Sequence, residues 1–251
     1  MTKAKDIFDY MQSFAPMSLA MPYDNCGILV GDSEKEVSKA IVTLDITSDV
    51  IDEAVRKGAE LIISHHPIIF SPLKSVLSDS CVYKLIQNGI TALCMHTNLD
   101  LSQENGVNIT LAKALGLENI ATVEGECLLT GELQTKYSVE NFAKYVKERL
   151  DCQGVRYTKG EKSIKRVAVA CGAGGDYVFN CEKLGADAFV TGEIKHHQII
   201  QANEIGLTVV DAGHYKTEDV IIPVLVRLLS EKFADTRFYK SESFNDNVFY
   251  L

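Results

Sequence analysis

The two halves of the chain carry the same order of strand and helix patterns. Residues 39–64 give an apolar strand pattern, an amphipathic run and a second apolar strand, and residues 165–191 repeat this order. The two turns that enter the second strand, Gly58-Ala-Glu and Gly185-Ala-Asp, are 127 residues apart. A repeat of this length constrains the topology more than any single element does.

Each copy continues through a further helix pattern to a third apolar strand, residues 90–95 in the first copy and 207–211 in the second. After each third strand stands a histidine followed four positions later by a carboxylate: His96 with Asp100, and His214 with Glu218. A Gly-Ala-Asp or Gly-Ala-Glu sequence before a buried strand is a common helix-to-strand turn, so chance resemblance of two βαβ units is the alternative. The matching order of five elements and the matched His-x-x-x-carboxylate favour a true repeat.

The strands are continuous apolar runs, which is typical of sheets covered on both faces by helices. We therefore predict an α/β fold with two similar lobes, residues 1–126 and 127–251, each a mixed, mostly parallel sheet flanked by helices. In such folds ligands collect beyond the carboxyl ends of the strands. We expect the functional site in the cleft between the lobes.

The composition excludes several classes of protein. The formal net charge is −9 and no long Lys/Arg stripe occurs, so nucleic acid is a poor candidate partner. No signal-peptide pattern or membrane-spanning apolar run is present, which predicts a soluble, cytoplasmic protein without membrane contact. The seven cysteines are widely spaced and form no CxxC, so we expect reduced thiols.

All six histidines lie in four short clusters at or just beyond strand ends. The clusters are His65-His66, His96 with Asp100, His196-His197, and His214 with Glu218. Imidazole and carboxylate gathered in this way are the usual ligands of divalent metals. Because side chains alternate along a strand, His65 and His66 should diverge, which suits ligation of two different ions.

Other interpretations compete at several of these positions. Asp100 could cap the following helix, and Thr217-Glu218 could be a capping pattern. Glu193 takes the repeat position of His66, so His196 and His197 should fall on the next helix, either as an exposed pair or as an acid or base near the site.

Two further segments also have alternative explanations. The stretch 24–27, Asp-Asn-Cys-Gly, is either an ordinary turn or places a carboxylate over the site. The glycine-rich loop 171–176 is either a tight turn or a phosphate cradle, although it lacks a complete GxGxxG or P-loop pattern.

The motifs SHHP at 64–67, HTNLD at 96–100, GEIKHH at 192–197 and DAGHYKTE at 211–218, in this order, resemble the GTP cyclohydrolase 1 type 2 homologues, also described as Nif-three-like dinuclear-metal proteins. The resemblance covers essentially the whole chain and is to the short form, without an inserted middle domain. It implies two divalent ions (Zn, Fe, Mn or Co) and a toroidal homohexamer. It also implies His65 and His214 as ligands of one ion, His66 and Asp100 of the other, and Glu218 as a bridge.

Five protein ligands for two ions leave coordination positions open, as in a catalytic site. The resemblance therefore implies a metal-dependent hydrolase that opens the guanine ring of GTP through metal-bound hydroxide. Proton transfer would then be the work of His96, Glu193, His196 or His197. A hydrolase of a phosphoester or amide, and a non-catalytic metal-binding scaffold or regulatory adaptor, are the alternatives.

Overall fold

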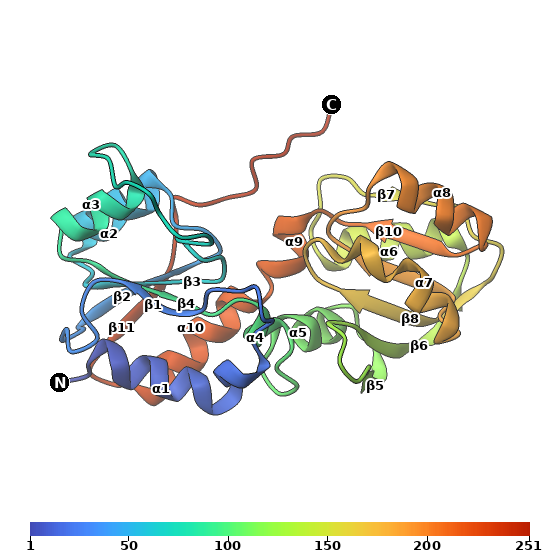
Figure 1. Ribbon diagram of the computed structural model, residues 1–251. Coiled ribbons are helices and arrows are strands. Elements are labelled where there is room, and N and C mark those ends of the chain that lie inside the picture. The colour runs from blue at the N-terminus through green and yellow to red at the C-terminus, as the bar shows by residue number, and fades with distance from the viewer. The chain divides into compact units, whose positions relative to one another are not determined.

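The computed structural model describes residues 1–251, which form two compact units. Unit 1 comprises Met1–Gly106 and Ile221–Asn245, and unit 2 comprises Val107–Val220 and Asp246–Leu251. Each unit contains one sheet with flanking helices, so the predicted α/β class with two sheets is confirmed (Figure 1). The unit bounds differ from the predicted division at 126/127 in two places: residues 107–126 belong to unit 2, and residues 221–245, with the last helix and strand, belong to unit 1.

The sheet of unit 1 has the strand order β1-β4-β3-β2-β11. All of its pairings are parallel except that of β1 with β4. The elements of unit 1 are α1 (Ala4–Phe14), a 3-10 helix (Met17–Leu19), β1 (Gly27–Val30), β2 (Lys39–Thr43), α2 (Ser48–Lys57), β3 (Leu61–Ser64), α3 (Cys81–Gln87), β4 (Thr91–Cys94), α4 (Thr97–Asp100), α10 (Ile221–Lys232) and β11 (Arg237–Lys240).

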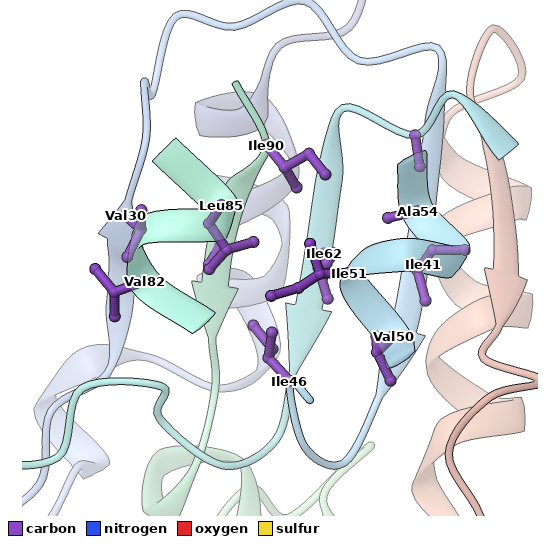
Figure 2. Packing of buried hydrophobic residues seen from close by; sticks show 12 residues of the cluster. Val30, Ile41, Ile46, Val50, Ile51, Ala54, Ile62, Val82, Leu85 and Ile90 are labelled. Atoms are coloured by element: carbon purple, nitrogen blue, oxygen red, sulfur yellow. The ribbon is translucent and has the colours of Figure 1, made fainter. Parts of the chain in front are cut away.

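Helices α2 and α3 cover one face of this sheet, and α1 and α10 lie on the other (Figure 1). Local signals set the bounds of α2: the Thr47 side chain accepts a hydrogen bond from the Val50 amide at 3.3 Å, and Gly58 ends the helix in the left-handed conformation. Figure 2 shows the core between this helix layer and the sheet, where Ile51 of α2 and Leu85 of α3 pack near Ile62 of β3. Burial of such side chains contributes about 1.5–3 kcal/mol each.

The C-terminal segment completes unit 1 through strand pairing and one buried carboxylate. β11 pairs in parallel with β2, with Tyr239 opposite Ile41. The chain after β11 is held by Glu53 of α2, whose carboxylate accepts hydrogen bonds from the Ser241 hydroxyl at 2.7 Å and the Ser243 amide at 3.0 Å. These long-range contacts have no local signature in the sequence, which explains why the predicted lobe boundary placed this segment elsewhere.

The sheet of unit 2 has the strand order β5-β6-β8-β9-β10-β7. Its central strands β8, β9 and β10 are parallel, and the pairings outside them are antiparallel. The elements of unit 2 are α5 (Val107–Ala114), β5 (Glu118–Thr122), β6 (Leu129–Tyr137), α6 (Val139–Arg149), β7 (Arg156–Tyr157), β8 (Ile164–Ala170), a 3-10 helix (Gly174–Tyr177), α7 (Val178–Lys183), β9 (Ala188–Thr191), α8 (His196–Glu204), β10 (Thr208–Asp211) and α9 (His214–Glu218).

Both units use the same connectivity for their central strands. Three parallel strands in chain order are joined by helices, β2-α2-β3-α3-β4 in unit 1 and β8-α7-β9-α8-β10 in unit 2. In each, the short strand that precedes the first of them pairs antiparallel with the third, β1 with β4 and β7 with β10. The junction near 120–138 forms the β5–β6 hairpin, and β6 extends the sheet beside β8.

The seven cysteines are free thiols, and Cys94, Cys152, Cys171 and Cys181 are buried. Burial raises the pKa of the Cys152 thiol to about 11 and that of Cys181 further still. These two side chains therefore stay protonated and act as small apolar packing groups. None of the helices has the length and apolar character needed to cross a bilayer.

Candidate metal-binding residues

Three histidine rings of unit 1 converge at the carboxyl ends of β3 and β4. His65 and His66 directly follow β3, and His96 follows β4 after one residue. Their ring centroids are 4.9 to 5.5 Å apart, and one potential ligand atom from each ring lies within 4.8 Å of the others. The sheet produces this convergence, because parallel neighbours end at the same edge.

The predicted divergence of His65 and His66 is wrong. Their ring centroids lie 4.9 Å apart with the planes tilted by 45°. The strand β3 ends at Ser64, so the alternation of side chains that holds within a strand no longer applies to the two residues after it. His65 is 1% exposed and His66 is partly exposed, so the two rings differ in burial.

Each of the three rings is oriented through its Nδ1 atom by an oxygen acceptor. The His65 Nδ1 lies 3.0 Å from the Met95 carbonyl, the His66 Nδ1 lies 3.0 Å from Asp45 Oδ1, and the His96 Nδ1 lies 2.8 Å from Asp24 Oδ1. A carbonyl only accepts, so the His65 Nδ1 carries the hydrogen, and the neutral ring has its lone pair at Nε2. Metal-binding histidines are typically held in this way.

Asp24 ends a turn and places its carboxylate against His96. Its side chain is fully buried, and it accepts hydrogen bonds from the Thr97 amide at 2.9 Å and the Thr97 hydroxyl at 2.5 Å. Burial alone would raise the pKa of Asp24, but the hydrogen bonds from His96 and Thr97 outweigh it and hold the pKa well below its usual range. A buried carboxylate therefore fixes the His96 ring.

Asp100 is the last residue of the short helix α4 and does not cap a helix that follows it. The next helix, α5, begins only at Val107. The Asp100 side chain is largely buried, and its Oδ1 lies 3.4 Å from the His65 Nε2. The structure therefore places the Asp100 carboxylate next to His65, where it adds a potential oxygen ligand to the three imidazole rings.

In unit 2, the helix α9 brings together a second group of metal-ligand residue types. His214 begins this helix and Glu218 ends it, with 3.0 Å between His214 Nε2 and Glu218 Oε2. The His214 Nδ1 lies 2.8 Å from Glu193 Oε1, so this ring too is oriented by an oxygen. Glu218 is 3% exposed. Thr217 lies inside α9, whose N-cap is Gly213, so the capping interpretation of Thr217-Glu218 does not hold.

The glycine-rich loop 171–176 is a tight turn that packs against this group. Gly172 has φ +56°, and a Cβ added there would lie 2.3 Å from Glu218 Oε1 and 3.1 Å from His214 Nε2. The amides of Gly172 and Gly174 donate to the hydroxyls of Thr217 and Thr191, at 3.1 and 3.0 Å. Because these amides are used within the unit, the structure favours a turn over a phosphate cradle.

The other sequence candidates have different positions. Glu193 is exposed and orients His214. His196 and His197 are the first two residues of α8, as predicted, and both are exposed. The structure thus brings Glu193, but neither of these two histidines, against His214.

Sequence reasoning missed Asp45 and Gly172. Asp45 lies two residues after β2, so it belongs to the same set of strand ends as the histidines, and that rule could have found it. At Gly172 the loop sequence indicates only a tight turn or a phosphate cradle. The role of Gly172 in leaving room for Glu218 depends on a contact across 46 positions of sequence, which no local pattern announces.

Comparison with known proteins confirms the family that the sequence motifs indicate. The model of the family described as DUF34/NIF3 (NGG1p interacting factor 3) matches residues 2–246. Two relatives, both named GTP cyclohydrolase 1 type 2 homolog, come from Clostridium acetobutylicum and Clostridium perfringens. The first is 35% identical, covering 90% of this chain and 89% of the relative. The second is 33% identical, covering 97% and 98%.

Solved structures of similar proteins share the fold over the full length. A crystal structure of a Staphylococcus aureus hypothetical protein is 31% identical, with a TM-score of 0.92 and coverage of 99% of each chain. The structure of reduced HcgD from Methanocaldococcus jannaschii is 29% identical, with a TM-score of 0.83 and coverage of 96% of this chain and 98% of the other. With the family model spanning residues 2–246, this chain belongs to the DUF34/NIF3 family.

Proposed function

We propose that this protein binds two divalent metal ions and acts as a metal-dependent hydrolase that opens the guanine ring of GTP. One observation carries the metal-binding part: four histidines, His65, His66, His96 and His214, each have Nδ1 within 3.0 Å of an oxygen acceptor. That arrangement orients the Nε2 atoms as ligands. The reaction is supported by the names of the relatives, which are called GTP cyclohydrolase 1 type 2 homolog.

The proposed ligands are His65, His66, Asp100, His214 and Glu218, as the family resemblance implies. Imidazole nitrogen and carboxylate oxygen together suit Zn, Fe, Mn or Co. Both nitrogens of His65 face oxygens, the Met95 carbonyl and the Asp100 carboxylate. With the hydrogen on Nδ1, the Nε2 lone pair would face the Asp100 carboxylate, a repulsion that a cation bound to both relieves. The residues present therefore fit a divalent ion.

His96 is a potential further ligand or a proton carrier. Its Nδ1 is held by the buried Asp24 carboxylate, so Nε2 is the atom that would bind an ion or move a proton. Glu193 supports His214 through its Nδ1. His196 and His197 remain proposed proton-transfer groups, at the exposed start of α8. Divalent ions, when bound, supply Lewis-acid activation of water and stabilise developing negative charge.

The test is turnover by protein loaded separately with Zn, Mn, Fe or Co. We expect GTP to yield formate and a dihydropterin triphosphate, which is detected by fluorescence after oxidation to the pterin with added iodine. Glu218→Gln should abolish this product while the circular dichroism spectrum stays that of the wild type. The matched control is Glu204→Gln, which changes an exposed glutamate on α8 and should leave turnover unchanged.

Absence of turnover of GTP, other nucleotides and phosphoesters with all four metals would refute the hydrolase and leave a metal-binding scaffold. Turnover of a phosphoester or amide in place of GTP would replace the substrate but keep the enzyme class. We also propose a homohexamer, from the family resemblance alone. Light scattering after gel filtration should give six times the chain mass of 27.7 kDa, and a monomer mass would exclude it.

A further inference from the structure

Two exposed aromatic side chains stand beside the histidine rings of unit 1. Tyr23 precedes the Asp24 turn and is 65% exposed, and Phe70 lies in the loop after β3 and is 52% exposed. Their ring centroids are 6.5 Å apart and their planes are tilted by 47°, so the rings are neighbours without being stacked on each other. We call Tyr23 and Phe70 the aromatic pair.

The aromatic pair is contiguous with the candidate metal ligands. The Phe70 ring lies 6.5 Å from the His96 ring, at an interplanar angle of 77°. His96 in turn lies 5.2 Å from His65 and 5.5 Å from His66, measured between ring centroids. A molecule that reaches the Nε2 atoms of these histidines therefore passes within contact range of a large apolar surface.

The segment that leads into Phe70 is anchored to unit 1. Ile68 and Ile69 pack against the core of unit 1, and the Asn25 side-chain amide donates a hydrogen bond to the Ile69 carbonyl at 2.6 Å. Phe70 is thus held at the end of an anchored segment although its own ring is not buried. Packing of the core does not explain a phenylalanine at this position.

One turn links the aromatic pair to the histidine cluster. Asp24 holds the His96 ring, and its neighbour Asn25 holds the backbone beside Phe70. Tyr23 is the residue before them. The turn therefore fixes an imidazole and two exposed aromatic rings relative to one another, which is the preorganisation that a binding site for a small ligand requires.

We propose that the aromatic pair binds a planar heteroaromatic ring of the substrate by stacking and so presents that ring to the histidine cluster. This inference rests on the proposed function and deepens it, because it assigns recognition of the ring to Tyr23 and Phe70. Aromatic side chains stack on any nucleobase, since every base has a π face. Stacking on the aromatic pair therefore selects ligands with a flat ring and does not depend on the sugar or phosphate attached to that ring.

The test separates the ring from the phosphates. Guanosine carries the ring alone, and inorganic triphosphate carries the charge alone. Calorimetric titration of metal-loaded protein should show guanosine binding about 5- to 150-fold weaker in Phe70→Ala and in Tyr23→Ala, from the ~1–3 kcal/mol of a base-aromatic stack. Triphosphate binding should not change. Phe70→Tyr keeps a ring and should restore guanosine binding.

Phe179→Ala is the matched control, because Phe179 is an aromatic residue of unit 2 with a similar exposed fraction, 44%. It should leave guanosine binding intact. Equal weakening of guanosine and triphosphate, unchanged guanosine binding in both alanine variants, or no guanosine binding by the wild type would each overturn the proposal. A change of assembly mass in Phe70→Ala would do the same, by marking the aromatic pair as a protein interface.

Failure of the proposed function gives a different result. If guanosine binds the wild type and depends on Phe70, but GTP is not converted, the aromatic pair stands and the ring-opening reaction does not. If GTP is converted but loss of the rings leaves guanosine binding unaffected, the reaction stands and the aromatic pair does not.

Discussion

Replacing Gly172 by alanine tests whether the glycine-rich loop leaves room for the metal-ligand group of unit 2. The backbone there has φ +56°, where an L side chain costs roughly 1–2 kcal/mol. The new Cβ would lie 2.3 Å from Glu218 Oε1, and the buried Glu218 side chain has little space to withdraw. Overpacking of this kind costs typically about 1–3 kcal/mol, so we expect a total of about 2–5 kcal/mol.

Gly185→Ala is the control that isolates the steric part. Gly185 also has positive φ, +68°, but nothing lies within 4 Å of an added Cβ. This variant should lose only the backbone contribution of roughly 1–2 kcal/mol. The difference between the two variants is therefore the cost of displacing Glu218 and His214.

The assay is urea unfolding of the metal-free protein with a chelator present, so that bound metal adds nothing to stability. Metal affinity is measured separately, by competition with a chromophoric chelator. Gly172→Ala should weaken metal binding and Gly185→Ala should not. Equal destabilisation of the two variants, within about 0.5 kcal/mol, together with equal metal affinity, would refute the reasoning.

Two further substitutions probe groups that support the fold and the histidines. Asp45→Asn removes the carboxylate that orients His66 and should weaken metal binding about 10- to 100-fold. The control Asp52→Asn, on the exposed face of α2, should leave metal affinity unchanged. Equal metal affinities of the two variants in chelator competition would count against this role of Asp45. Burial would raise the pKa of Glu53, but hydrogen bonds from Ser241, Glu242 and Ser243 outweigh it and lower that pKa below 4.5. The Glu53 carboxylate therefore contributes about 1–3 kcal/mol of stability, which is complete above the unfolded pKa and is lost as pH falls through the folded pKa. The difference in unfolding free energy between wild type and Glu53→Gln should shrink below about pH 4. A difference that stays constant from pH 7 to pH 3 would contradict this role.

The central strands could be predicted because their signals are local. Apolar runs at 40–42 and 167–170, with turns at Gly58 and Gly185, give both the strands and their order. Once the strands are predicted, the sequence also shows that the histidines follow the strand ends, where ligands collect in α/β folds. The four short motifs also allow the family to be identified from the sequence alone.

The remaining features depend on contacts between distant residues. β11 joins the sheet of unit 1 through pairing with β2, about 200 positions earlier in the chain, and Glu53 secures the segment after it. No local sequence pattern near residue 237 predicts that pairing. The orientation of the His65 ring by the Met95 carbonyl also follows from the fold and not from any motif.

The most direct test is the metal content of the purified protein, measured by plasma mass spectrometry after loading and desalting. We expect two divalent ions per chain in the wild type and fewer in His66→Ala and Glu218→Ala, with circular dichroism confirming that both variants fold. A wild-type ratio near zero, or the same ratio in all three proteins, would contradict a dinuclear centre with these ligands.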